Sequence, residues 1–263
     1  MTELRAIFDE DAERYDRARP GYPAALFDDL AELAGVGPGC RLLEIGPGTG
    51  KATVDLARRG CRLVAVELGP NLAAVARANL AAVDAAPASY EVVVSAFETW
   101  PLPPEPFDVV LAATAYHWLD PAVRVGRIAA ALRPGGTLAV VETHHIEGGD
   151  AGFFVDAQRC YERWDPATPP DLRLPAPEQV PRLTDTDHSG LFEPAVFRRY
   201  EWDHSYTRSA YLDLLLTYSN HRALPEPAQA GLLACVGGLI DSRVGGRITK
   251  RYLTQLWLSR RRA

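Results

Sequence analysis

The sequence has no long hydrophobic run and no excess of positive charge. Its apolar stretches, such as residues 63–66 and 109–113, are far shorter than a bilayer requires, so we expect no membrane-spanning segment. Lysine and arginine number 28 against 34 for aspartate and glutamate, which gives a net charge of −6. A mildly acidic chain without a basic tract lacks the footprint of a nucleic-acid-binding protein, and nucleic acid is not an expected partner.

Signals for secretion, disulfide bonding and metal binding are also missing. Residues 1–23 are charged and interrupted by Pro20 and Pro23, unlike a signal or transit peptide. The four cysteines stand far apart without a C-x-x-C pair, which predicts neither a zinc site nor a disulfide framework. They are Cys40, Cys61, Cys160 and Cys235. We therefore expect a cytoplasmic protein with reduced thiols.

The chain does contain a regular alternation of short apolar runs and helical stretches in its first half. Apolar runs connected by helices favour right-handed crossovers and a parallel sheet covered on both faces. The ligand of such a sheet lies beyond the carboxyl ends of its strands. The strands are predicted at residues 41–46, 62–67, 90–95, 107–113 and 137–143, and the helices at 52–59, 71–82 and 122–132.

The second half is less regular and completes the sheet. Two alternating segments, 196–206 and 251–259, predict the sixth and seventh strands. The predicted fold is therefore α/β, a Rossmann-like sheet of seven mostly parallel strands with helical lid insertions. Helices are predicted at residues 152–164, 209–219 and 227–242.

The segment with the clearest chemical meaning is LLEIGPGTGKAT, residues 42–53. A strand runs into three glycines and then into a helix, a turn that lets backbone approach a ligand closely. Glu67 ends the second strand, at the interval expected for a carboxylate that binds ribose. A dinucleotide fingerprint would need its third glycine at position 51, where Lys51 stands.

These motifs resemble the class I S-adenosylmethionine (SAM) dependent methyltransferases of the type 11 and type 25 kind. The pattern E-x-G-x-G-x-G and an acidic second strand carry the resemblance, followed by SAFETWP (95–101), FDVVLAATAYHWLDP (107–121) and ALRPGGTLAVVE (131–142). The branch that includes trans-aconitate methyltransferases is the most similar. The resemblance implies SAM as cofactor and a small-molecule acceptor, methylated on O, N or C.

The resemblance also implies which residues bind SAM. The backbone at Gly46, Pro47 and Gly48 would hold the methionine part, and Glu67 would bind the ribose. Ala96 stands where many relatives have an acid that contacts the adenine amine, so either that contact would be missing or Glu98 would replace it. The complete predicted set is Tyr15, Arg19, Glu44, Gly46, Pro47, Gly48, Gly50, Glu67, Leu68, Ala96, Phe97 and Ala113.

Three side chains beyond the fourth and fifth strands are candidates for catalysis. Tyr116 and His117 follow the fourth strand, and His145 follows the fifth, so each could meet the acceptor. The alternative is that they simply pack beneath a lid. Adjacent His144 and His145 would point to opposite faces of an extended chain, and no metal site is expected.

The organisation that follows is one methyltransferase domain over residues 1–263. Residues 1–40 would form a cap of helices and 41–143 the SAM-binding core, while 144–195 and 207–245 would be substrate-lid insertions. A monomer or homodimer is expected. Two other functions stay open: an NAD(P)-dependent oxidoreductase of the same fold, and a SAM-binding protein without catalysis.

Overall fold

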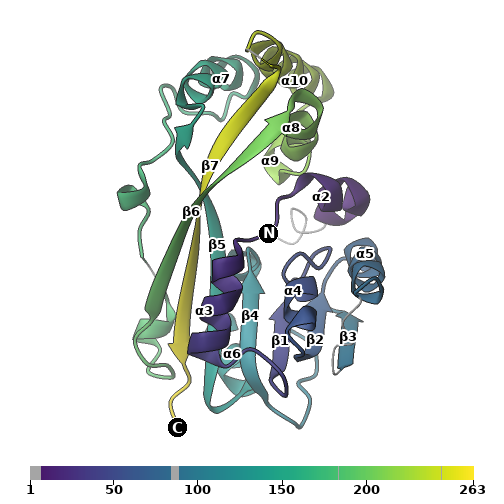
Figure 1. The fold of residues 1–263 in the computed structure, drawn as a ribbon, viewed down its shortest axis with the longest axis vertical. Helices are drawn as coiled ribbons and strands as arrows, with labels where there is room; N and C mark the ends of the chain where they lie inside the picture. Colours follow the sequence, from purple (N-terminus) through teal and green to yellow (C-terminus); the bar gives the residue numbers. More distant parts are fainter. Residues whose placement is uncertain (1–6, 84–88, 183, 244) are drawn as a thin grey trace.

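The computed structural model describes residues 7–83, 89–182, 184–243 and 245–263. Its seven-stranded sheet has the order β3-β2-β1-β4-β5-β7-β6 (Figure 1). All neighbouring strands are parallel except β7, which runs antiparallel to β5 and β6. The predicted fold class is confirmed. The strands are β1 Arg41–Ile45, β2 Arg62–Glu67, β3 Ser89–Val94, β4 Phe107–Ala113, β5 Leu132–Gly149, β6 Val196–Thr207 and β7 Arg247–Arg260.

Helices cover both faces of this sheet, because successive side chains of its central strands point to opposite faces and are buried on both. Leu42 of β1 packs on one face against α3 and α4, whereas Leu43 packs on the other face against α6. The helices around the sheet are α2 Ala12–Ala18, α3 Ala24–Ala34, α4 Thr53–Arg58, α5 Pro70–Ala81 and α6 Arg124–Ala131, with the 3-10 turns η1 Ile7–Asp11, η2 Tyr116–Trp118, η3 Pro177–Gln179 and η4 Thr186–His188.

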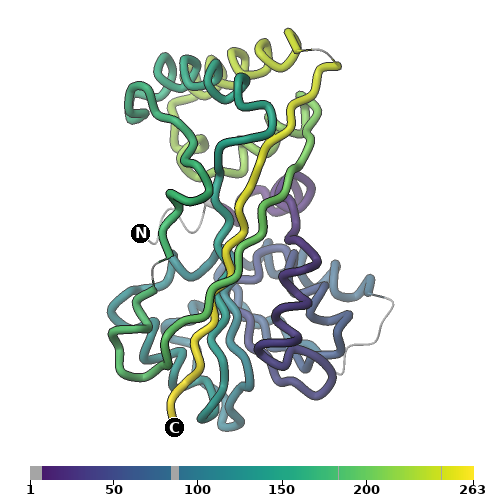
Figure 2. Tube along the Cα trace, turned by 60° about the vertical axis from the view of Figure 1, so that its left-hand side comes forward, coloured from purple at the N-terminus to yellow at the C-terminus, as the bar shows by residue number. Residues whose placement is uncertain are grey.

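The strands β5, β6 and β7 continue well past their neighbours and carry a group of helices at their far end (Figures 1 and 2). We call this group the lid. It has its own apolar core, which includes Phe153, Tyr211, Val236 and Tyr252. Its helices are α7 Ala151–Trp164, α8 Arg208–Leu215, α9 Ser219–Arg222 and α10 Glu226–Asp241.

The lengths of β5 and β7 differ from the prediction. We expected β5 to end at residue 143 and β7 to begin at 251, but their pairing continues through His145 with Tyr252 to Gly149 with Lys250. The added residues are mainly polar, charged or glycine, and they bring only one buried isoleucine to each strand, Ile146 and Ile248, which is too few to predict a strand from the apolar pattern. They are nevertheless held in the ladder because they face the lid.

One disulfide bond corrects the prediction of four reduced cysteines. Cys160 of α7 is bonded to Cys235 of α10, and the two are 75 residues apart in the sequence. Such a pair has no recognisable spacing, because the fold rather than the sequence brings it together. Cys40 and Cys61 are free and buried. None of the described helices is long and apolar enough to cross a membrane.

Candidate functional site

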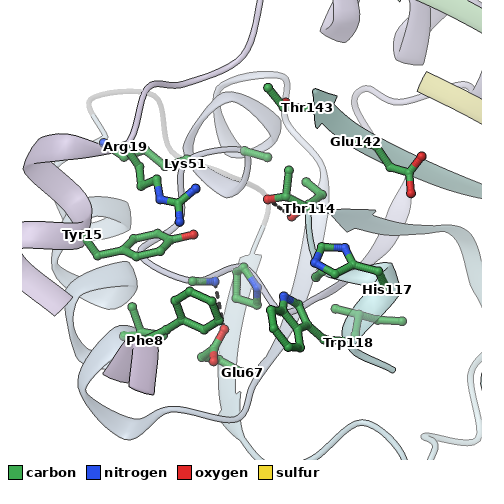
Figure 3. Close-up of a pocket in the computed structure, with 18 of the residues that line it drawn as sticks. Phe8, Tyr15, Arg19, Lys51, Glu67, Thr114, His117, Trp118, Glu142 and Thr143 are labelled. Atoms are coloured by element: carbon green, nitrogen blue, oxygen red, sulfur yellow. Dashed lines mark hydrogen bonds between the residues drawn. The ribbon is translucent and has the colours of Figure 1, made fainter. Parts of the chain in front are cut away.

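A cavity of about 560 Å³ opens at the carboxyl ends of β1, β2 and β4 and beside residues 142–145 of β5 (Figure 3). We call it the cleft. It lies at the edge where parallel α/β sheets bind their ligands. The strands contribute its floor, while η1 and α2 of the N-terminal segment border it through Phe8 and Tyr15.

The glycine turn after β1 forms one wall of the cleft. Gly46, Gly48 and Gly50 have φ values of +63°, +59° and +87°, in the left-handed region that other residues resist. A Cβ on Gly46 would lie 2.8 Å from the Ala115 Cβ. The turn therefore needs glycine for its own path, and its backbone is left open toward the cleft.

Glu67 stands at the end of β2 and faces the same turn. Its Oε2 accepts a hydrogen bond from the Gly48 amide, and its Oε1 accepts one from the Gly69 amide, both at 2.9 Å. Burial raises the pKa of this carboxyl, while those amides and that of Leu68 oppose the rise. Each carboxylate oxygen keeps a further lone pair for a ligand hydroxyl.

Glu44 of β1 is the most deeply buried acid of the cleft. It is 1% exposed, and its Oε2 has no hydrogen-bond partner in the part of the chain that the structure describes. Its pKa is raised to about 7, mainly by burial; the Thr53 side chain opposes the rise, and the charge of Glu67 adds to it. A buried carboxyl oxygen without a partner is costly for the protein alone, and it fits a cationic group such as an ammonium.

Arg19 connects the cap to the lid on the opposite side of the cleft. Its guanidinium lies over the rings of Tyr15 and Tyr218, at 5.2 and 4.3 Å from their centroids. Its Nη2 donates to the Thr217 carbonyl at 3.1 Å, whereas its buried Nε has no partner. Figure 3 shows this side chain on the far side of the cleft from Glu67. It can therefore meet an anionic group of a ligand.

A polar and aromatic wall completes the cleft between β4 and β5. His117 and Trp118 of η2 face it, together with Glu142 of β5 (Figure 3). Burial lowers the pKa of His117, the Glu142 charge opposes this, and Arg124 adds to it. The imidazole is therefore neutral near pH 7 and can accept a proton.

Most residues predicted from the sequence meet in the cleft. Those that line it are Tyr15, Arg19, Glu44, Gly46, Pro47, Gly48, Glu67, Leu68, Phe97, Ala113, His117 and His145. Gly50 and Ala96 are not in the lining. Gly50 instead supports the turn next to Ala76 of α5. Glu98 is also outside the lining and accepts a hydrogen bond from the Asp120 amide.

Tyr116, a candidate catalytic residue, is not in the lining of the cleft. Its hydroxyl donates to Asp185 at 2.5 Å, and its ring packs edge-on against Trp257. It belongs to the core on the face of the sheet that α6 covers. The 3-10 turn η2 sends Tyr116 into this core and His117 into the cleft, an orientation that sequence order alone does not reveal.

Several cleft residues were not found from the sequence. Thr114 has a φ of +52°, rare for a residue with a branched side chain, and its hydroxyl contacts the Tyr22 hydroxyl at 3.1 Å. No sequence signal marks that strain. Glu142 is the penultimate residue of the predicted fifth strand, so the rule about carboxyl ends could have identified it. Phe8 and Tyr252 reach the cleft only through the tertiary fold.

Metal ligands do not gather in this region. Within the described ranges, no group of three or more His, Cys, Asp or Glu side chains is placed to hold a metal ion. The His144 Nε2 lies 3.8 Å from the Glu142 Oε2, whereas the His145 ring packs edge-on against the rings of Tyr218 and Tyr252.

Comparison with known proteins shows that this chain is similar to methyltransferases. Residues 43–140 match the family described as "Methyltransferase domain". An uncharacterised methyltransferase of Mycobacterium tuberculosis is 40% identical over 127 residues, which are 48% of this chain and 48% of that protein. The malonyl-[acyl-carrier protein] O-methyltransferase of Serratia marcescens is 31% identical over 175 residues, 63% of each chain. The chain thus matches about half the length of the mycobacterial relative.

A solved structure extends the likeness of fold to the lid. A proposed type II methyltransferase from Anaeromyxobacter dehalogenans superposes with a TM-score of 0.58 and 24% identity, over 93% of this chain and 97% of the other. At that identity the superposition shows the fold alone. Together these matches confirm the resemblance to the class I SAM-dependent methyltransferases. None of them tests the trans-aconitate branch, which stays a prediction.

Proposed function

We propose that this chain, whose residues 43–140 match the methyltransferase domain family, transfers a methyl group from SAM to a small molecule in the cleft. One relationship carries the proposal. A buried acid with an unpartnered oxygen, Glu44, lies beside a left-handed glycine turn whose Gly48 amide is held by Glu67. These groups suit an amino acid and a ribose bound side by side.

Each group has a role in holding the cofactor. Glu44 would pair with the methionine ammonium, and Arg19 would pair with its carboxylate. Glu67 would accept hydrogen bonds from the ribose hydroxyls, while Leu68 and Phe97 would pack on the adenine. The backbone of Gly46 and Gly48 would let the chain approach the methionine part closely.

The remaining wall would position the acceptor. Bound SAM supplies a methyl group on a cationic sulfur, which is already activated for transfer. The chain's task is then to align the accepting atom with that methyl group and to exclude water. His117 would remove a proton from the accepting atom, and Glu142 would stabilise the imidazolium that results.

The division of the chain into parts is also proposed here. Residues 41–143 would bind SAM, residues 1–40 would cap it, and 144–195 with 207–245 would enclose the acceptor. Positions 1–6, 84–88, 183 and 244 of these parts lie outside the described residues. A cytoplasmic monomer or homodimer without a nucleic-acid partner is part of the same proposal.

The test is a comparison of ligands on the purified protein by calorimetry. We expect SAM and S-adenosylhomocysteine to bind and NADH not to bind. Binding of NADH without SAM would instead support an oxidoreductase. Methyl transfer is then measured with labelled SAM and a panel of small hydroxyl, amine and carboxylate acceptors. SAM binding without transfer to any acceptor would favour the non-catalytic alternative.

A further inference from the structure

A second cavity, of about 600 Å³, lies in the lid beyond the cleft. The far ends of β5 and β7 border it together with α7, α8 and α9, in the upper part of Figure 1. We call it the lid chamber. His145, Tyr218 and Asn220 line both the chamber and the cleft, so the two adjoin. The volume is in the usual range for a small-molecule site.

Lys250 of β7 is the unexpected residue of this chamber. Its side chain lines the cavity and is only 4% exposed. Its ammonium contacts the rings of Phe154, Tyr211 and Tyr252, with centroids 5.5 to 5.8 Å away. Among the described residues it has neither a hydrogen bond nor a carboxylate within ion-pair distance. Lysine is rarely buried this deeply without a partner.

The other ionisable groups of the chamber do not supply the missing negative charge. Glu147 is exposed at the rim, and Asp165 is half-buried at the end of α7. Burial lowers the pKa of His145 and lowers that of His221 to about 4, so both imidazoles are neutral near pH 7. Burial likewise lowers the pKa of Lys250 to about 7, and Arg19 adds to this effect.

The opening of the chamber carries two large apolar side chains beside the charged Glu147 and Arg173. Val155 and Leu172 line it and are 41% and 54% exposed, among the few large apolar side chains left in water. The interior is mainly aromatic and aliphatic. A ligand that enters here therefore has an apolar body as well as a charged group.

We propose that the lid chamber holds the methyl acceptor, a small organic acid with an apolar body whose single carboxylate pairs with Lys250. The accepting atom would reach the cleft past His145 and Tyr218. This inference rests on the proposed function. It implies that the carboxylate anchors the acceptor, whereas another atom, at the opposite end of the molecule, receives the methyl group.

The charge of the chamber selects a carboxylate over a phosphate ester. One buried ammonium matches a single negative charge, and a phosphate monoester brings up to two near pH 7. The one guanidinium in the lining, that of Arg173, is on an exposed residue and contacts Asp171 at 3.9 Å. The interior thus offers no second cation to balance a dianion.

The experiment uses the whole chain saturated with S-adenosylhomocysteine, so that the cleft is occupied and the lid chamber remains available to the probe. Binding of 4-phenylbutyrate is compared with binding of its neutral amide, 4-phenylbutanamide, by calorimetry. We expect the carboxylate to bind at least about tenfold more tightly, as a charge-assisted contact should provide. In Lys250→Met, which keeps the stem and removes the charge, the preference should disappear while the affinity for S-adenosylhomocysteine stays unchanged.

A second variant keeps the proposal testable if Lys250→Met does not fold. Val155→Trp narrows the opening from an exposed position on α7, and it should weaken carboxylate binding without affecting S-adenosylhomocysteine. The proposal is overturned if the wild-type protein binds neither probe or binds both equally. It is overturned as well if Lys250→Met keeps the preference, or if the phosphate monoester of 3-phenylpropanol binds more tightly than the carboxylate.

Failure of the proposed function has a different signature. It would appear as absent binding of SAM and S-adenosylhomocysteine to the wild-type protein. The comparison of carboxylate with amide can still be made on that protein, and it then reports on the chamber alone.

Discussion

The Glu67 carboxylate holds the glycine turn of the neighbouring strand by accepting a hydrogen bond from the Gly48 amide at 2.9 Å. The same carboxylate accepts a second bond from Gly69 at the start of α5. A side chain proposed to bind the ribose therefore also fixes the backbone proposed to bind the methionine. The two halves of the cofactor site are coupled through one residue.

The coupling makes Glu67 a sensitive position. We expect Glu67→Ala to weaken SAM by about 1.5–3 kcal/mol, the range for hydrogen bonds to a charged group, or by about 10- to 150-fold. Calorimetry with SAM measures this change. Glu91→Ala, an exposed glutamate on the adjacent strand β3, is the matched control and should bind normally. Equal affinity in the two variants would contradict the cofactor site.

Alanine substitutions at two glycines of the turn, Gly46 and Gly48, should destabilise the folded protein to different extents. Both Gly46→Ala and Gly48→Ala force an alanine to a positive φ, at about 1–2 kcal/mol. Only at Gly46 does the added Cβ also meet Ala115 at 2.8 Å; at Gly48 the nearest atom is in the Tyr15 ring at 3.6 Å. Gly46→Ala should therefore lower the free energy of unfolding further, by an additional ~1–3 kcal/mol.

Urea denaturation of the two variants measures this difference. Gly48→Ala then serves as the matched control for the effect of φ. It should remain folded yet bind SAM more weakly, and a larger side chain, as in Gly48→Val, should bind it hardly at all. Equal losses of stability would show that Ala115 moves aside.

Glu44 predicts a specific dependence of stability on pH. Its pKa in the folded protein is about 7, against 4.5 for an ordinary glutamate, because burial disfavours the charge. The folded state thus binds the Glu44 proton more tightly than the unfolded state does. This tighter binding adds to the free energy of unfolding; the contribution is complete below about pH 4.5 and is lost as the pH rises through 7. The difference corresponds to about 3 kcal/mol at most.

The variant Glu44→Gln removes this titration. We expect it to be more stable than the wild-type protein at about pH 8, while their stabilities converge toward about pH 5. It should also bind SAM more weakly, because the proposed partner of the ammonium is gone. Urea unfolding at both pH values and calorimetry test the two effects separately. A variant that is less stable at high pH would contradict the burial argument.

The sequence was most informative where side-chain burial follows a simple period. The strand 62–67 was predicted to its last residue because both faces of a central parallel strand are covered, so its apolar run is continuous. Glu67 was found for a related reason, since a polar residue at the end of such a strand stands out, whereas Glu44 entered the predicted set through the resemblance to the methyltransferases.

Prediction failed where the fold places residues in ways that the sequence does not encode locally. Lys250 ended outside the predicted strand because a charged residue breaks the apolar alternation, yet it is buried. Tyr116 and His117 are adjacent, and only the turn η2 decides that they face different surroundings. The pairing of Cys160 with Cys235 depends on the packing of α7 against α10.

That disulfide should stabilise the lid without serving the cofactor. Neither sulfur-bearing residue lines the cleft. A crosslink across 75 residues typically contributes about 2–5 kcal/mol. We expect Cys160→Ala/Cys235→Ala to unfold at a lower temperature and to bind S-adenosylhomocysteine within several-fold of wild type. Calorimetric melting checks this, with reduced wild-type protein as the control that should melt like the variant. Unchanged melting would mean that the bond contributes nothing to stability.

His117 gives the prediction that separates the possible acceptors by their chemistry. If the carboxylate of the acceptor is held by Lys250, the methylated atom is another group, and a hydroxyl or ammonium group must lose a proton to become nucleophilic. His117 is the neutral imidazole on the wall of the cleft where that atom would lie. We therefore expect His117→Asn to lower kcat by about 10²–10⁴-fold, as the loss of a general base does, with SAM affinity unchanged.

The dependence of kcat on pH provides the decisive control. Burial lowers the pKa of His117, so the wild-type rate should fall only below about pH 6.5, where the imidazole becomes protonated. The variant should lose this acidic limb. His204→Asn, a histidine of β6 that is outside the cleft, should keep both the rate and the limb. If His117→Asn retains the wild-type rate, the accepting atom carries no proton at the time of attack, as for a carboxylate oxygen. The carboxylate would then have to face the cleft rather than Lys250, so this one variant also tests the orientation of the acceptor.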